Sequence, residues 1–504
     1  MKSNLSYETI KINKIIFNRN LEQTVDFEYQ LPDYYTGIFK VLKFTLEPHI
    51  TSYKAANKQL IIEGNSTAKI LYIDEENGDI KSIYQNIPFS KTVNLEEEAN
   101  DTIIFCNAKT NYKNCKIVSS KKIEIKATLN IYVKIQAQKE ENILKNSNNN
   151  SVQLKNNIAR ITSNQIWTTQ QFNINEQVEF DSLAKEILDV RINIEDDECK
   201  IITNKIISKS IAHIEVLYCS EAKNSPIIQK TSIPINNIID MPDINENYIY
   251  TINYDIISTN FEILQEGKFL NVEANVVINS YGNLYDEIEI ITDAFSTKYE
   301  LQPITKEFAH YMTISNIDKE ISLKETVENI NIYKLFDVTA NITDLTYSQN
   351  DKNIEFKAKL NFNALGLSKE ETLETYSKLI PVEFKISDKN IKPNLTNINI
   401  NSITLISSNS NLKDEKILEV KLNFKIKGFV SINETLNAVT DLNLDENKLK
   451  EKSKSALTLF YPKPGDEIWS IAKNFSTSPK AIMDANGLEE DIIKEEIMLI
   501  IPIM

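Results

Sequence analysis

The stretch IEIKATLNIYVKI, from Ile123 to Ile135, alternates apolar and polar residues from end to end. The apolar positions are Ile123, Ile125, Ala127, Leu129, Ile131 and Val133. Strict alternation over this length predicts a β-strand with one buried face. The stretches LNVEANVVINSY, from Leu270, and LEVKLNFKIKGF, from Leu418, keep the same phase. The pattern that sets the fold therefore occurs three times.

Other landmarks share this spacing. Three Ile-Pro pairs close polar stretches 146 and 147 residues apart, at Pro88, Pro234 and Pro381. The motifs IFKV, ILDV and LFDV lie 149 and 148 residues apart, ending at Val41, Val190 and Val338. Several landmarks with one period indicate tandem copies of one domain. We expect each proline to stand where a strand begins, because proline lacks the N–H that a strand interior uses.

These patterns predict a mainly β protein. Three tandem β-rich, sandwich-like repeats are expected at 1–140, 161–305 and 306–442, followed by a small α+β module at 456–504. Residues 141–160 form an Asn-rich segment and residues 443–455 a charged one, and both are predicted to be linkers. The stretch DSLAKEILDV, from Asp181, is compatible with a short helix, but alternating strands dominate the repeats.

The composition of the chain disfavours several classes of function. The 504 residues carry a formal charge of −15, which disfavours binding to nucleic acid or to anionic membranes. No apolar run approaches the roughly 20 residues of a membrane span. The N-terminus shows no apolar signal segment, so an intracellular protein is expected. The four cysteines form no C-x-x-C pair and are predicted to be free thiols in a reducing compartment.

Nothing in the sequence predicts catalysis, a metal or a cofactor. The nine glycines are too widely spaced for a phosphate-binding loop or a dinucleotide fingerprint. His49, His213 and His310 are the only histidines, and none has a motif partner. The acidic stretches EDDE, from Glu195, and DEENGD, from Asp74, fit no metal-binding spacing and are predicted to be solvated turns. We therefore expect a non-enzymatic protein without metal or cofactor.

The last segment has a different pattern. In KPGDEIWSIAKNF, from Lys463, the residues Ile468, Ile471, Ala472 and Phe475 form one helical stripe. Asp466 is placed to cap this helix. Ser478-Pro479 predicts the start of a second helix, because serine is a good N-cap and proline suits the first helical position. With a strand near Phe460 and another at MLIIP, from Met498, the predicted order is β-α-α-β.

This segment resembles the LysM family through KPGDEIWSIAKNF, AIMDANGL and the final LIIP. The resemblance implies a ligand groove between the loop entering the first helix and the loop leaving the second. The groove residues carried over are Gly465, Asp466, Glu467, Ile468, Asn486, Gly487, Leu488 and Ile493.

Three departures from the LysM pattern favour a protein over a sugar as the ligand. Glu467 stands where the family commonly has Thr or Ser, Glu495-Glu496 replaces the usual Pro-Gly, and Ile497 and Met498 occupy commonly polar positions. Trp469 lies off the helical stripe. Two readings of it stay open: packing on a neighbouring strand, or an exposed anchor, since Trp is enriched at binding hot spots.

A β-rich repeat with LYID and IPF segments before a LysM module resembles the SPOCS-domain, SipL-like proteins of endospore-forming bacteria. The resemblance implies a scaffold or adaptor in spore coat assembly, located in the mother-cell cytoplasm at the forespore surface. It also implies that the LysM module tethers the chain to a coat ATPase, stage IV sporulation protein A. The alternative is an exported protein whose LysM module binds cell-wall glycans of the peptidoglycan or chitin type.

Overall fold

The computed structural model of the chain describes residues 5–99, 102–221, 223–350, 353–387, 396–414, 416–451 and 457–502. Eighteen strands form three successive groups of six, and two short helices follow near the C-terminus. The predicted mainly β fold is confirmed. The segment from Asp181 to Val190, compatible in sequence with a helix, lies largely in a strand.

The three groups have the same strand order. In each group the last strand pairs with the first and the fifth, and the second, third and fourth form a separate sheet. Copy one consists of β1 (Leu5–Gln30), β2 (Ile38–Ala56), β3 (Gln59–Asp74), β4 (Ile80–Asn94), β5 (Thr102–Ser119) and β6 (Lys122–Ser147). Copy two consists of β7 (Val152–Glu179), β8 (Ala184–Ile202), β9 (Lys205–Ser220), β10 (Lys223–Asp240), β11 (Ile249–Leu264) and β12 (Phe269–Ser296), with the 3₁₀ turn η1 (Gln265–Gly267) before β12. Copy three consists of β13 (Tyr299–Glu328), β14 (Lys334–Asn350), β15 (Asn353–Leu367), β16 (Leu373–Ser387), β17 (Thr396–Asp414) and β18 (Ile417–Leu449).

The alternating stretch explains why each copy is a sandwich. Every second residue of β6 from Ile123 to Ile135 is buried and joins residues of β3, such as Ile70, in one apolar core. From Val133 to Ala137 the residues on both faces of β6 are buried. One face covers the other sheet of the same copy, and the second face contacts the neighbouring copies.

Equivalent residues of the three copies meet along a common axis. Leu71, Leu217 and Leu365 occupy the same place in their copies and lie in one apolar cluster. Further along the axis, Leu144, Ile291 and Val439 form another such layer. The copies are therefore arranged with pseudo-threefold symmetry, and burial on this axis holds them together.

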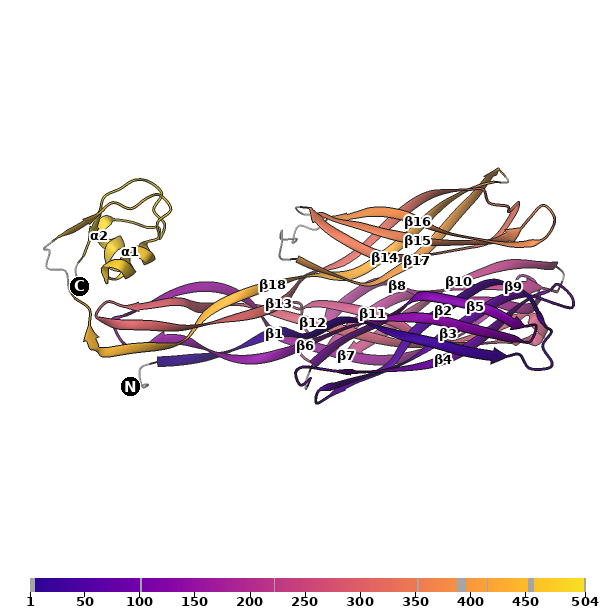
Figure 1. The fold of residues 1–504 in the computed structure, drawn as a ribbon, viewed down its shortest axis with the longest axis horizontal. Helices are drawn as coiled ribbons and strands as arrows, with labels where there is room; N and C mark the ends of the chain where they lie inside the picture. Colours follow the sequence, from indigo (N-terminus) through magenta and orange to yellow (C-terminus); the bar gives the residue numbers. More distant parts are fainter. Residues whose placement is uncertain are drawn as a thin grey trace.

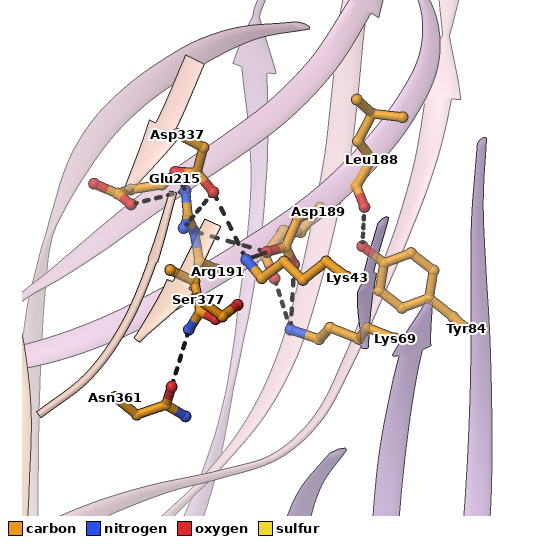
Figure 2. A network of polar contacts seen from close by, with 12 residues as sticks. Lys43, Lys69, Tyr84, Leu188, Asp189, Arg191, Glu215, Asp337, Asn361 and Ser377 are labelled. Carbon is orange, nitrogen blue, oxygen red and sulfur yellow. Dashed lines mark hydrogen bonds and ion pairs between the residues drawn. The ribbon is translucent and has the colours of Figure 1, made fainter. Parts of the chain in front are cut away.

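A network of charges crosses the same interface (Figure 2). Arg191 of copy two donates to both carboxylate oxygens of Asp337 in copy three, at 2.9 and 3.1 Å. Lys43 of copy one lies 3.7 Å from Asp337, and Lys69 lies 3.5 Å from Asp189 of copy two. Burial alone would raise the pKa of Asp189, but Lys69, Lys43 and Arg191 together hold that pKa below its usual value. The pairing compensates the cost of burying these charges at the junction of the three copies.

Long ribbons extend from this body as a stalk, formed by residues 5–15 with 136–147, 152–164 with 284–296, and 299–313 with 431–449 (Figure 1). The residues predicted as linkers fall largely in these ribbons. Residues 141–147 end β6, 148–151 make a turn, and 152–160 begin β7. Residues 443–449 are the end of β18, while 452–456 lie outside the described residues.

Two expectations about strand positions are wrong. Pro88, Pro234 and Pro381 occupy equivalent places in β4, β10 and β16, but they lie inside these strands rather than at their starts. All three strands are sheet edges, the positions within a sheet where proline is tolerated. The stretch from Glu195 to Glu198 is also within a strand, β8, and Asp196 forms an ion pair with Lys427 of copy three.

Candidate functional site

The C-terminal module has the predicted β-α-α-β order. It consists of β19 (Thr458–Phe460), α1 (Ile468–Phe475), α2 (Pro479–Asn486) and β20 (Leu499–Ile501), with β19 and β20 paired. The core contains Ile468, Ile471, Ala472 and Ile482, all buried. Ser478 caps α2 as predicted, because its Oγ accepts from the N–H of Ala481 at 3.0 Å. Asp466 does not cap α1; the N-cap is Glu467, and Asp466 Oδ2 accepts from the N–H of Lys463 at 2.8 Å.

The two loops of the expected groove are hydrogen-bonded to each other. The N–H of Gly465 donates to the carbonyl of Ile493 at 2.7 Å, and the N–H of Ile493 donates to that of Asp466 at 2.9 Å. Gly465 and Gly487 have φ of 98° and 61°, a backbone conformation that favours glycine in both turns. These bonds fix the shape of the loop pair.

Several residues predicted to line the groove pack in the core or bond the backbone of the module, so they are not free to bind a ligand. Ile468 and Ile493 are core residues, exposed by only 0% and 3%. The side-chain amide of Asn486 bonds the backbone of Ile500 in both directions, at 2.8 and 2.7 Å, and so fixes β20 to α2. Leu488 and Ile497 are half-buried against the core, whereas Gly465, Gly487 and Met498 are exposed.

The module is docked on the tip of the stalk through α1. The indole of Trp469 packs edge-on against Phe295 of β12, with ring centroids 4.9 Å apart, and Phe295 belongs to the module's own core cluster. Lys473 forms an ion pair with Asp293 at 2.7 Å, and Glu467 forms one with Lys155 of β7 at 2.6 Å. Burial opposes the ionisation of Asp293, but Lys473 and the Trp469 N–H hold its pKa below the usual value. Of the two readings of Trp469, the structure supports packing.

Docking leaves one apolar face of the module uncovered. Leu459 of β19 is paired with Ile500 of β20. Alternation turns these residues away from the helices, whereas Leu499 and Ile501 face them and are buried. The face, called here the apolar strip, comprises Leu457, Leu459, Tyr461, Met498 and Ile500. Tyr461 is 72% exposed, and its hydroxyl lies 3.3 Å from the Met498 sulfur. Of this set only Met498 was predicted from the sequence, although the alternation in LTLFY and MLII is a usable signal.

The module also exposes acidic side chains. Glu489, Glu490 and Asp491 are exposed in the loop after α2, and Glu495 and Glu496 are exposed just before Met498. Glu490 is paired with Lys494 at 2.6 Å. Glu495 and Glu496 precede Met498 of the strip directly in the sequence, and an apolar surface with acidic neighbours suits a partner whose apolar patch is bordered by basic groups.

The structure brings together a histidine, a serine and a glutamate, residue types found in catalytic sites, and this cluster was not predicted from the sequence. His213 Nδ1 lies 2.9 Å from Ser232 Oγ, and its Nε2 lies 3.3 Å from Glu195 Oε2. The three residues are cross-strand neighbours on β10, β9 and β8, and Lys425 of copy three lies 3.7 Å from Glu195. The cluster thus belongs to the contact between copies two and three. The described residues hold no group of three His, Cys, Asp or Glu side chains that could bind a metal.

His310 and the cysteines are also accounted for by packing. His310 is 1% exposed in the stalk, its Nε2 accepts from the N–H of Thr162 at 3.1 Å, and burial lowers its pKa to about 4. The four cysteines are free, and burial raises the pKa of the Cys106 thiol to about 12. Neither helix in the described part of the chain is long and apolar enough to cross a membrane.

Comparison with known proteins agrees with this architecture. The model of the SipL, SPOCS domain matches residues 37–118 and 184–264, and the model of the LysM domain matches residues 463–502. The first two regions cover parts of copies one and two, and the third covers most of the module. No curated protein and no solved structure gives a significant match. Both domain families are non-catalytic. The chain therefore combines two regions similar to the SPOCS domain of SipL with a C-terminal LysM domain, an arrangement that matches a sporulation-related, SipL-like protein.

Proposed function

We propose that this protein is a non-enzymatic adaptor in endospore coat assembly, and that its LysM domain tethers it to a coat ATPase scaffold resembling stage IV sporulation protein A. The observation that carries the proposal is the apolar strip. Five large apolar side chains on and beside one small sheet are exposed, while the helical side of the same domain is docked on the stalk. Exposed apolar surface of this kind marks protein–protein contacts.

The chemistry of the surface favours a protein over a sugar. A carbohydrate groove needs polar hydrogen-bonding groups around an aromatic platform. Here Trp469 and Asn486, the two side chains best suited to that task, are bound to Asp293 and to β20. Gly465, Asp466, Glu467, Gly487 and Leu488 remain as the rim of the proposed partner site, with Met498 shared with the strip.

The second candidate function is binding of a peptidoglycan- or chitin-type glycan. The LysM match supports it, because the match includes both loops of the groove and Gly465 and Gly487 are exposed. Under this reading the protein reaches the cell wall, whereas under the adaptor reading it stays in the mother-cell cytoplasm at the forespore surface.

A fluorescent fusion of the full chain in sporulating cells separates the two. The adaptor proposal expects signal around the forespore that disperses when the coat ATPase is deleted. A fusion in which Leu459 and Ile500 are both changed to Ser should disperse as well, while a Lys357→Met fusion, altered at an exposed lysine of copy three, should localise normally. Signal in the cell wall that persists without the ATPase would overturn the proposal.

A further inference from the structure

A cleft of about 400 Å³ opens between copy one and copy three, away from the LysM domain. Its wall includes residues of β1, β6, β13, β14, β17 and β18. This volume lies within the usual range of small-molecule sites. The cleft is independent of the apolar strip and of the proposed tethering.

The lining has an unusual charge for so acidic a chain. The protein has 71 acidic and 56 basic residues, yet the twelve described residues that line the cleft include no Asp or Glu. Five are asparagines, three are tyrosines, two are isoleucines, and the remaining two are the cations Lys134 and Arg19. The wall therefore offers positive charge and neutral hydrogen-bonding groups.

Lys134 is a buried cation in the wall of the cleft, and this indicates an anionic ligand. It is 1% exposed, and among the described residues no carboxylate forms an ion pair with its ammonium group; burial alone shifts its pKa. Its Nζ donates to the hydroxyl of Tyr311 and lies 3.9 Å from that ring's centroid and 4.9 Å from that of Phe429. A buried cation normally has an anionic partner, because desolvation of the charge is costly.

The fold itself does not require a cation here. The residues of copies two and three that correspond to Lys134 are Tyr281 and Phe429, and both pack against Phe105 beside it. Aromatic packing thus fills this layer of the pseudo-threefold axis in two copies, and copy one alone places an amine there. Burial lowers the pKa of Lys134 to about 7. No nearby negative charge from the residues that the structure describes offsets the cost of burying the ammonium form.

We propose that this cleft binds a small oxyanion, a carboxylate or phosphate compound, with Lys134 as its buried counter-charge. Asn399 lines the same wall, where its amide Nδ2 lies 3.2 Å from Ser431 Oγ and its Oδ1 accepts from Tyr132 at 3.4 Å. Arg19 stands at the rim and is held loosely by the exposed Glu96 at 3.4 Å. An anion that contacts Lys134 restores the ammonium form, since an opposite charge nearby favours the charged state.

The test uses the full chain with citrate and with inorganic phosphate, each at about 10 mM and against sodium chloride of equal ionic strength, so that a site with a Kd near 1 mM is filled. Acetylation of Lys134 is measured by mass spectrometry as a function of pH. One of the two anions should raise the apparent pKa of Lys134 by at least about one unit, which lowers its reactivity roughly fivefold at pH 7 and about tenfold at pH values well below both pKa values. Thermal unfolding of the same samples should move to higher temperature with that anion.

Three variants make the result specific. Lys134→Met keeps the length and apolar packing of the side chain and should abolish the anion-dependent thermal shift, whereas the exposed Lys357→Met should retain it. Asn399→Asp places a carboxylate in the wall and should raise the pKa of Lys134 without any added anion. The proposal is overturned if neither anion changes Lys134 reactivity or thermal stability beyond the chloride control, or if Lys134→Met responds as the unaltered chain does.

Discussion

The indole N–H of Trp469 donates a hydrogen bond of 2.8 Å to Oδ2 of Asp293, a residue 176 positions earlier in the chain. The side chain that the LysM motif offers as a ligand anchor is therefore used to fix the domain on its own stalk. The stalk holds the helical side of the domain, so the apolar strip on the opposite side of the sheet faces outward.

Trp469→Ala should loosen the docked domain without unfolding it. The substitution removes the ring contact with Phe295 and the bond to Asp293, together worth about 1–3 kcal/mol. Hydrogen exchange of the amides near Phe295 and in α1 should accelerate, while the body exchanges as before. Trp469→Phe, which keeps an aromatic ring against Phe295 but loses the N–H bonded to Asp293, should show a smaller effect. Unchanged exchange in both variants would show that the docking contact is not formed in solution.

Asp337→Asn should destabilise the junction of the three copies by about 3–5 kcal/mol, because it leaves Arg191 buried with a weakened set of partners. Denaturant unfolding followed by tyrosine fluorescence measures this. The matched control is Glu383→Gln, which breaks the exposed pair with Lys357 and should cost under about 1 kcal/mol. Equal losses of unfolding free energy in the two variants would mean that the buried network stabilises the chain no more than an exposed ion pair does.

Stability of the stalk should fall with acidification because of His310. Its pKa is about 4 in the folded chain and near 6.5 when unfolded, so the unfolded state binds the extra proton first. The stabilisation is complete above about pH 6.5 and is lost as the pH falls towards 4, by on the order of 3 kcal/mol. His310→Leu should flatten this part of the pH profile, measured by hydrogen exchange at Thr162 and its neighbours. A slope that persists in the variant would assign the dependence to other groups.

Ile471→Asp should unfold the LysM domain and leave the body intact, because Ile471 is 4% exposed and a buried carboxylate has no partner there. Loss of the helical signals of α1 and α2 in NMR spectra checks this. Ser470→Asp, one position earlier on the exposed side of the same helix, should leave the domain folded. Unfolding in both variants would contradict the assignment of the core stripe.

The sequence was sufficient to predict the strands, their threefold recurrence and the LysM order, because alternation and capping are local signals. The joining of the copies was not predicted. Leu71 lies between Ile70 and Tyr72, and Leu217 between Val216 and Tyr218, so each strand is apolar on both faces at that point. Consecutive apolar residues at equivalent positions indicate burial on both sides, and this signal could have revealed the axis.

The candidate site was predicted only in part, for a physical reason. Gly465 and Gly487 follow from loop geometry, which the motif encodes. The contact of Trp469 with Phe295 depends on where the stalk ends, and no local pattern specifies that. Asn486 was assigned to ligand binding although its amide fixes β20, because a side chain that bonds backbone and one that bonds ligand have the same sequence signature.

The central claim is that the LysM domain binds a protein through its apolar strip, and calorimetric titration of the full chain tests it most directly. The purified coat ATPase and a chitin or peptidoglycan oligosaccharide are titrated separately. Binding to the ATPase is expected, with Tyr461→Ala lowering affinity by roughly 1–3 kcal/mol if Tyr461 is a hot spot, and with Trp469→Phe leaving affinity unchanged. Tight binding of the oligosaccharide together with no binding of the ATPase would contradict the account and establish the glycan-binding function instead.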